Sequence, residues 1–118
     1  MTRVLICEDD PLQAIDLADA VAAYGGQVCA CVGNSVDALA AAKSLVPDIA
    51  MIDLKLADGE TGVDLVLKIS RLGCRVIVLS GSTQSHPKLG RIRHSFVSKP
   101  IPREVIAELM RVNERVAH

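Results

Sequence analysis

Short apolar runs alternate along the chain with longer segments whose apolar positions repeat every three or four residues. The apolar runs lie at residues 3–7, 27–32, 48–53, 75–79 and 95–98. The first run is continuously apolar after Arg3, which is typical of a strand covered on both faces. The fourth run is rich in β-branched residues. Strands of this kind separated by helices predict βα units around a parallel sheet.

The first helix is predicted from Pro11 to the Gly25-Gly26 pair. Asp10 is expected as its N-cap, and Gln13 is expected to complete a pair resembling a capping box. The apolar stripe of this helix is predicted at Leu12, Ile15, Ala18 and Ala22.

The other helices are predicted at residues 35–46, capped by Asn34 or Ser35, at residues 62–71, and from Pro102 onward. The last helix carries an apolar face, which consists of Val105, Leu109, Val112 and Val116. Residues 81–94 are rich in Ser and Gly and include Pro87, so they predict a loop or a stunted helix.

Polar side chains that could bind a ligand or take part in a reaction lie at the ends of the predicted strands. They are Glu8, Asp9 and Asp10 after the first, Asp53 at the third, Ser80 after the fourth and Lys99 after the fifth. Singly, each has an ordinary explanation: Asp10 could cap a helix, Asp53 could cap a loop, and Ser80 could satisfy backbone groups at a strand end. Glu8, Asp9 and Lys99 could be ordinary surface charges. Ligands of open parallel sheets, however, bind at the carboxyl ends of the strands.

The clustering of these acids gives a second reason to expect a site. Carboxylates ~4 Å apart repel by about 4 kcal/mol at an effective dielectric of 20, so such a cluster favours a bound cation. Mg²⁺ suits carboxylate oxygens, and a carboxylate beside Mg²⁺ can act as a nucleophile towards phosphorus.

The set Glu8-Asp9, Asp53, Ser80 and Lys99-Pro100, each at a strand end in this order, resembles the receiver domain of two-component response regulators. The resemblance covers essentially the whole chain. It implies one receiver domain over residues 1–118, with a flavodoxin-like, doubly wound α/β fold. The fold would have a five-stranded parallel sheet in the order 2-1-3-4-5 and about five helices, the fourth short or irregular.

The same resemblance implies a role for each site residue. Asp53 would be the phosphoacceptor, Ser80 the switch hydroxyl, Lys99 the contact to the phosphoryl group and Phe96 an aromatic side chain that changes rotamer on activation. Mg²⁺ would be the cofactor, held by Asp9, Asp53 and the backbone carbonyl of Lys55, with Glu8 reaching it through water. The Lys99-Pro100 bond is expected to be cis.

Two features depart from the family pattern. Ala57 stands where a proline is usual, and Gly62 comes nine residues after Asp53 rather than eight. The segment between Ser80 and Lys99 is also a few residues shorter than is usual in the family. We therefore expect phosphorylation to be signalled through residues 81–94, which would become ordered or move.

Composition excludes several other classes of protein. The net charge is −1 with one Tyr, one Phe and no Trp, which is a poor match to nucleic-acid binding. No apolar run reaches the length of a membrane span, and no signal peptide precedes the first strand, so a cytoplasmic protein is expected. The four cysteines are expected to be small buried hydrophobes rather than metal ligands.

The function expected from this sequence is a stand-alone receiver, with Met1 directly before the first strand, although a receiver from a hybrid kinase would look alike. Its partners would be a sensor histidine kinase or a histidine phosphotransfer protein, with a downstream protein and a second copy of the chain as further candidates. It would catalyse only its own phosphorylation and dephosphorylation. A receiver-like binding module that is not phosphorylated is the alternative. A phosphohydrolase is disfavoured because Lys55 lies where a second acid is needed, and a flavodoxin because the first loop is acidic.

Overall fold

The computed structural model describes residues 1–53, 60–80, 95–99 and 101–117, and for residues 60–62, 95, 96, 98 and 112–117 it describes the backbone alone. Within these ranges, five parallel strands form one sheet in the order β2-β1-β3-β4-β5. The strands are β1 (Thr2–Cys7), β2 (Gly26–Val32), β3 (Ile49–Asp53), β4 (Arg75–Ser80) and β5 (Ser95–Ser98). The predicted flavodoxin-like strand order is confirmed.

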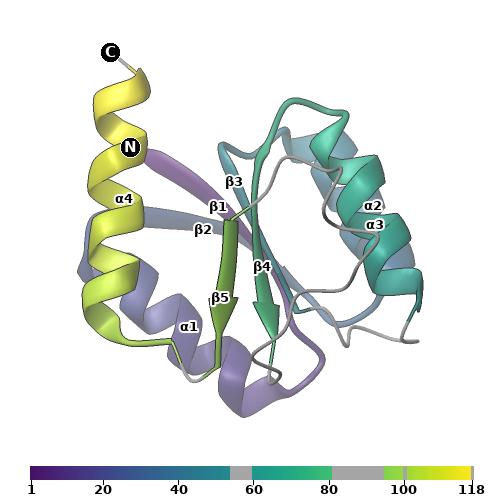
Figure 1. Ribbon diagram of the computed structural model, residues 1–118, viewed down its shortest axis with the longest axis horizontal. Coiled ribbons are helices and arrows are strands. Elements are labelled where there is room, and N and C mark those ends of the chain that lie inside the picture. The colour runs from purple at the N-terminus through teal and green to yellow at the C-terminus, as the bar shows by residue number, and fades with distance from the viewer. Residues whose placement is uncertain (54–59, 81–94, 100, 118) are drawn as a thin grey trace.

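Helices cover both faces of this sheet, as Figure 1 shows. They are α1 (Pro11–Ala23), α2 (Ser35–Leu45), α3 (Glu60–Ser70) and α4 (Arg103–Ala117). Helices α1 and α4 lie on one face, and α2 and α3 lie on the other. Successive strand residues point to opposite faces, so each face has its own apolar cluster. In β1, for example, Val4 packs towards α1 and α4, whereas Leu5 packs towards α2 and α3.

The buried face of α1 differs from the prediction. Leu12 is 79% exposed and Ile15 is 58% exposed, whereas Ala14, Leu17, Ala20 and Val21 are buried. Apolar residues occur nearly all round this helix, so two different stripes fit its sequence, and the sheet selects the one that includes Leu17. The consequence is that two large apolar side chains near the start of α1 face solvent.

Smaller differences concern the last helix and the cysteines. In α4, Leu109 is buried as predicted, but Ile106 and Met110 complete its buried face and Val105 is only half-buried. Side chains 112 and 116 lie outside the described part. All four cysteines are free; Cys7 and Cys74 are buried, but Cys29 is partly exposed and Cys31 is exposed. An irregularity in the pairing of β1 with β2 falls next to Cys29, on the edge strand of the sheet.

Several predictions concern residues whose placement is not described. Residues 81–94, which include the expected fourth helix, lie outside the described ranges, as do Lys55, Ala57 and the Lys99-Pro100 bond. The side chain of Phe96 also falls outside them. Among the described helices, none is long and apolar enough to cross a membrane.

Candidate functional site

The carboxyl ends of four neighbouring strands bring the predicted site residues together. Cys7 pairs with Ile52 across β1 and β3, so Glu8 and Asp53 leave the sheet side by side. Asp53 pairs with Leu79 of β4, which places Ser80 one residue further towards the same edge. The backbone N–H of Lys99 then donates to the carbonyl of Ser80 at 2.7 Å, which extends the pairing of β5 with β4 past the end of the strand. Glu8, Asp53 and Ser80 are all buried, with exposed fractions of 3 to 5%.

Three carboxylates gather at this edge. One oxygen atom from each of Glu8, Asp9 and Asp53 lies within 4.8 Å of the others. Asp9 is exposed, whereas the other two are buried, so the cluster opens to solvent on one side. Carboxylate oxygens are the donors that hard divalent cations such as Mg²⁺ prefer. The donor chemistry of the cluster therefore fits Mg²⁺.

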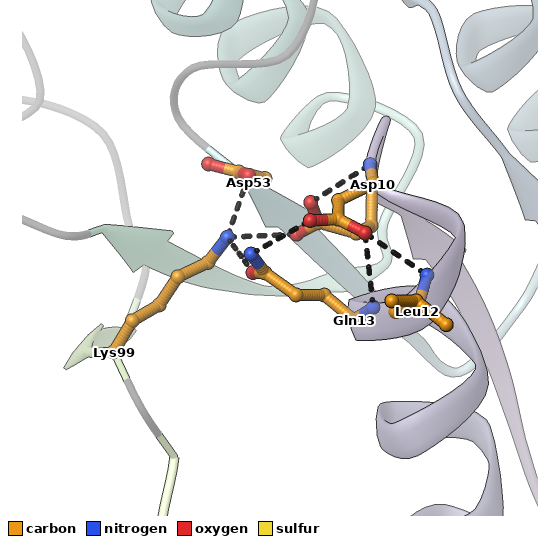
Figure 2. Close-up of polar contacts among 6 residues, drawn as sticks. Asp10, Leu12, Gln13, Asp53 and Lys99 are labelled. Atoms are coloured by element: carbon orange, nitrogen blue, oxygen red, sulfur yellow. Dashed lines mark hydrogen bonds and ion pairs between the residues drawn. The ribbon is translucent and has the colours of Figure 1, made fainter.

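Lys99 supplies positive charge to the buried acids. Its Nζ atom donates to Oδ2 of Asp53 at 2.7 Å, to Oε2 of Glu8 at 2.8 Å and to Oε1 of Gln13 at 2.8 Å, as Figure 2 shows for Asp53 and Gln13. Burial on its own would lower the pKa of Lys99, but the hydrogen bonds and charges of Asp53 and Glu8 outweigh it and raise the pKa above its ordinary value. The ammonium group therefore stays charged at neutral pH.

Glu8 has a raised pKa. Burial is the main cause, and the nearby Asp53 carboxylate adds to it, while hydrogen bonds from Lys99 and from the backbone N–H of Asp10 act in the opposite direction. The net upward shift means that one ammonium group does not fully compensate the buried negative charge. A second cation bound beside Glu8 and Asp53 would stabilise their negative charge.

The start of α1 joins this network. Asp10 is the N-cap, as predicted, and its Oδ1 atom accepts from the backbone N–H of Leu12 at 2.9 Å and of Gln13 at 3.4 Å. The pair of Asp10 and Gln13 forms, but its side-chain contact differs from that of a capping box. In a capping box the Gln13 side chain would accept from the backbone N–H of Asp10, whereas here its amide donates to Oδ2 of Asp10 at 3.2 Å. The N–H of Asp10 donates to Oε1 of Glu8 instead.

Sequence reasoning missed the contact between Gln13 and Lys99. The two residues are 86 positions apart, and only the proximity of Gln13 to the acidic turn after the first strand could have suggested it. The structure thus brings together Glu8, Asp9, Asp53, Ser80 and Lys99, and adds Gln13 to them.

A sequence model of the response regulator receiver domain matches residues 4–111 of the chain. Among curated proteins, the phyllosphere-induced regulator PhyR of Methylorubrum extorquens is 38% identical over 66 residues. That match covers 55% of this chain and 25% of the relative, so the chain spans about a quarter of the length of that protein.

Solved receiver structures share the fold. The signal receiver domain of a modulated diguanylate cyclase from Desulfovibrio desulfuricans superposes with a TM-score of 0.85 at 23% identity, covering 98% of this chain and 94% of the other. A receiver domain protein from Methanospirillum hungatei gives a TM-score of 0.82 at 21% identity, covering 98% and 95%. The N-terminal domain of a three-domain response regulator from Carboxydothermus hydrogenoformans gives 0.78 at 26% identity, covering 99% and 100%. With the family match spanning nearly its whole length, the chain belongs to the response regulator receiver domain family.

Proposed function

We propose that the chain accepts a phosphoryl group on Asp53 and signals through the change that follows. Receiver domains are signalling modules that are phosphorylated on an aspartate and bind Mg²⁺ in an acidic pocket. The observation that carries the assignment to Asp53 is its contact with Lys99, at 2.7 Å, inside a cluster of three carboxylates. Glu8 also contacts the ammonium group, but Asp53 is the acid in this cluster that lies on a strand, the central strand β3.

The chemistry follows from the groups at hand. A carboxylate oxygen of Asp53 attacks the phosphorus atom of a phosphohistidine, the new O–P bond forms, and the P–N bond breaks. The electron pair of the P–N bond stays on the imidazole nitrogen, and the donor histidine leaves as neutral imidazole because its other ring nitrogen already carries a proton. The Lys99 ammonium group lies 2.7 Å from the carboxylate proposed to attack, so it is close enough to neutralise negative charge that develops on the transferring phosphoryl oxygens.

Asp9 and Asp53 are proposed to hold Mg²⁺, with Glu8 acting through water and Lys55 through its backbone carbonyl. When bound, the ion would neutralise phosphoryl oxygens and orient them for in-line transfer. The exposure of Asp9 leaves the cluster open to solvent, which supports entry of both the ion and the donor from that side.

Ser80 is proposed as the hydroxyl that binds the phosphorylated form. It is 3% exposed and lies at the same edge as Asp53, on the adjacent strand β4. Its carbonyl also accepts a hydrogen bond from the backbone N–H of Lys99, so a shift of Ser80 would move the backbone at the end of β5. Phe96, on β5, is proposed as the aromatic residue that responds.

The phosphodonor is proposed to be a sensor histidine kinase or a histidine phosphotransfer protein. Exposed Leu12 and Ile15 support a protein donor, because they present apolar surface on the first turns of α1, beside the acidic turn. Large apolar side chains that gather next to a site are typical of protein contacts. A downstream protein that distinguishes the two states, or a second copy of the chain, would complete the signal.

The test is phosphorylation itself. The wild type and Asp53→Asn are incubated with Mg²⁺ and acetyl phosphate, and their intact masses are measured. A gain of one phosphoryl group in the wild type alone supports the proposal. No gain in either protein, together with no binding of beryllofluoride, would indicate a receiver-like binding module. Continuous release of phosphate at enzymatic rates would indicate a hydrolase.

A further inference from the structure

Gln13 lies between the helix cap and the lysine of the site. Its Oε1 atom accepts from Nζ of Lys99 at 2.8 Å, and its Nε2 atom donates to Oδ2 of Asp10 at 3.2 Å. Figure 2 shows this amide placed between the two charged groups. No role in the family assignment above uses this side chain.

The orientation of the Gln13 amide is determined by its neighbours. An ionised Asp10 can only accept hydrogen bonds, and the Lys99 ammonium group can only donate them. A flipped amide would place its NH₂ group against the ammonium group and its oxygen against the carboxylate, so both contacts would become repulsive. The orientation with oxygen towards Lys99 is therefore the stable one.

The contact completes the hydrogen bonding of Lys99. An ammonium group has three donors, and here they reach Asp53, Glu8 and Gln13. Two of the three acceptors are carboxylates of the acidic cluster, which any cation bound there would also attract. The Gln13 oxygen is uncharged and outside that cluster, so this contact can persist when the carboxylates are engaged elsewhere.

The space around Lys99 allows its side chain more than one position. Lys99, Glu8 and Gln13 line a cavity of about 350 Å³ that runs between α1 and α4 and is walled by Leu17, Leu79 and Ile106. A lysine has a long, flexible stem, and space beside it allows other rotamers. A fixed acceptor on α1 selects one of them.

We propose that Gln13 is a positioning residue that holds the Lys99 ammonium group beside Asp53, and that the Asp10 cap holds Gln13 in turn. The inference rests on the proposed function of Asp53. Displacement of a catalytic charge by a small distance costs rate, and loss of one such hydrogen bond is expected to slow phosphorylation about three- to tenfold.

A double-mutant cycle tests whether Gln13 acts through Lys99. Phosphorylation by acetyl phosphate with Mg²⁺ is followed by intact mass in the wild type, Gln13→Met, Lys99→Met and the double variant. Met is unbranched and of similar length but accepts hydrogen bonds poorly. Gln13→Met should slow the reaction about three- to tenfold in the wild type and have no effect in Lys99→Met. Asp19→Met, which places the same side chain at an exposed position of α1, should react as the wild type does.

A second measurement needs neither phosphorylation nor Mg²⁺. The exchange of the Lys99 ammonium protons with water is measured by NMR in the metal-free protein. Gln13→Met should accelerate it several-fold. Asp10→Ser should accelerate it by a smaller factor, because serine can still cap α1 but no longer offers the oxygen that holds the Gln13 amide.

The outcomes separate this inference from the proposed function. If the wild type is not phosphorylated on Asp53, the proposed function fails, while the NMR measurement still decides the contact. If the wild type is phosphorylated and Gln13→Met slows the reaction equally in the wild type and in Lys99→Met, Gln13 has a merely structural role and the inference is wrong. Unchanged ammonium exchange in Gln13→Met would also overturn it.

Discussion

The Nζ atom of Lys99 lies 2.7 Å from Oδ2 of Asp53, although the two residues are 46 positions apart and their strands are not neighbours. Strand β4 lies between β3 and β5, so the long lysine side chain must span it at the edge of the sheet. The contact places a positive charge directly on a buried carboxylate. The stability of the site therefore depends on how its charges are balanced.

Removal of Lys99 should make the fold depend more strongly on Mg²⁺. Lys99→Met leaves Glu8 and Asp53 buried without their counter-charge, and we expect it to lower the free energy of unfolding by about 1–3 kcal/mol in EDTA. Mg²⁺ should stabilise this variant more than the wild type, because the ion no longer competes with the lysine. Urea unfolding with and without Mg²⁺ measures both effects.

A matched control for this prediction is Lys68→Met. Lys68 forms an exposed ion pair with Asp64 on α3, and such pairs contribute about 0.5 kcal/mol or less. Its stability should respond to Mg²⁺ as the wild type does. An equal response of Lys99→Met and the wild type to Mg²⁺ would contradict the prediction.

The raised pKa of Glu8 predicts a pH-dependent stability in the absence of metal. The folded protein binds a proton at Glu8 more tightly than the unfolded chain does, so this contribution is present below the ordinary value of 4.5 and is lost as pH rises through the folded pKa. Glu8→Gln removes the titrating carboxyl group, so the variant does not lose this contribution to stability as the pH rises. Its stability relative to the wild type should therefore increase as pH rises from 4.5 towards neutrality, measured by urea unfolding in EDTA.

The comparison with an exposed position makes the pH prediction specific. Val36→Ser, on the exposed side of α2, removes no titratable group and should give a pH profile parallel to that of the wild type. Parallel profiles for Glu8→Gln and the wild type would show that burial of Glu8 does not govern its protonation.

The apolar surface on α1 predicts a difference between protein and small-molecule donors. Leu12→Ser and Ile15→Ser should reduce phosphotransfer from a cognate histidine kinase by about fivefold, because truncation of an apolar side chain at the centre of an interface can cost about 1 kcal/mol. Both side chains face solvent, so phosphorylation by acetyl phosphate should be unchanged. Val36→Ser, at an exposed position of α2, serves as the control. Equal losses with both donors would indicate damage to the site rather than to a docking surface.

The cysteines should differ in their reactivity with iodoacetamide. Burial raises the pKa of Cys7 to about 12, with smaller contributions from Cys31 and Cys29. At pH 9 its thiolate fraction would then be lower by about 500- to 1,000-fold than that of an ordinary thiol, and burial blocks access as well. Peptide mass mapping should find Cys31, which is exposed, alkylated in the folded protein and Cys7 alkylated only after unfolding. Early alkylation of Cys7 would contradict its placement in the core.

Much of this architecture could be predicted from the chain alone. The apolar runs specify strands covered on both faces, and the acids, serine and lysine that follow those runs are bound to meet once the strands are parallel. Strand ends are fixed by local sequence, so Glu8, Asp53, Ser80 and Lys99 could be placed at one edge before any coordinates. Asp10 was predicted as a cap for the same local reason.

Tertiary structure decided two features that the local sequence pattern leaves open, namely the buried face of α1 and the contact of Gln13 with Lys99. Apolar residues on nearly every side of α1 allow two buried stripes, and only packing on the sheet selected Leu17 over Leu12 and Ile15. The contact of Gln13 with Lys99 likewise depends on where α1 stands relative to the end of β5, which no local pattern specifies. Periodicity fixes which residues can share a face, but distances between side chains far apart in sequence are set only when the helices pack against the sheet.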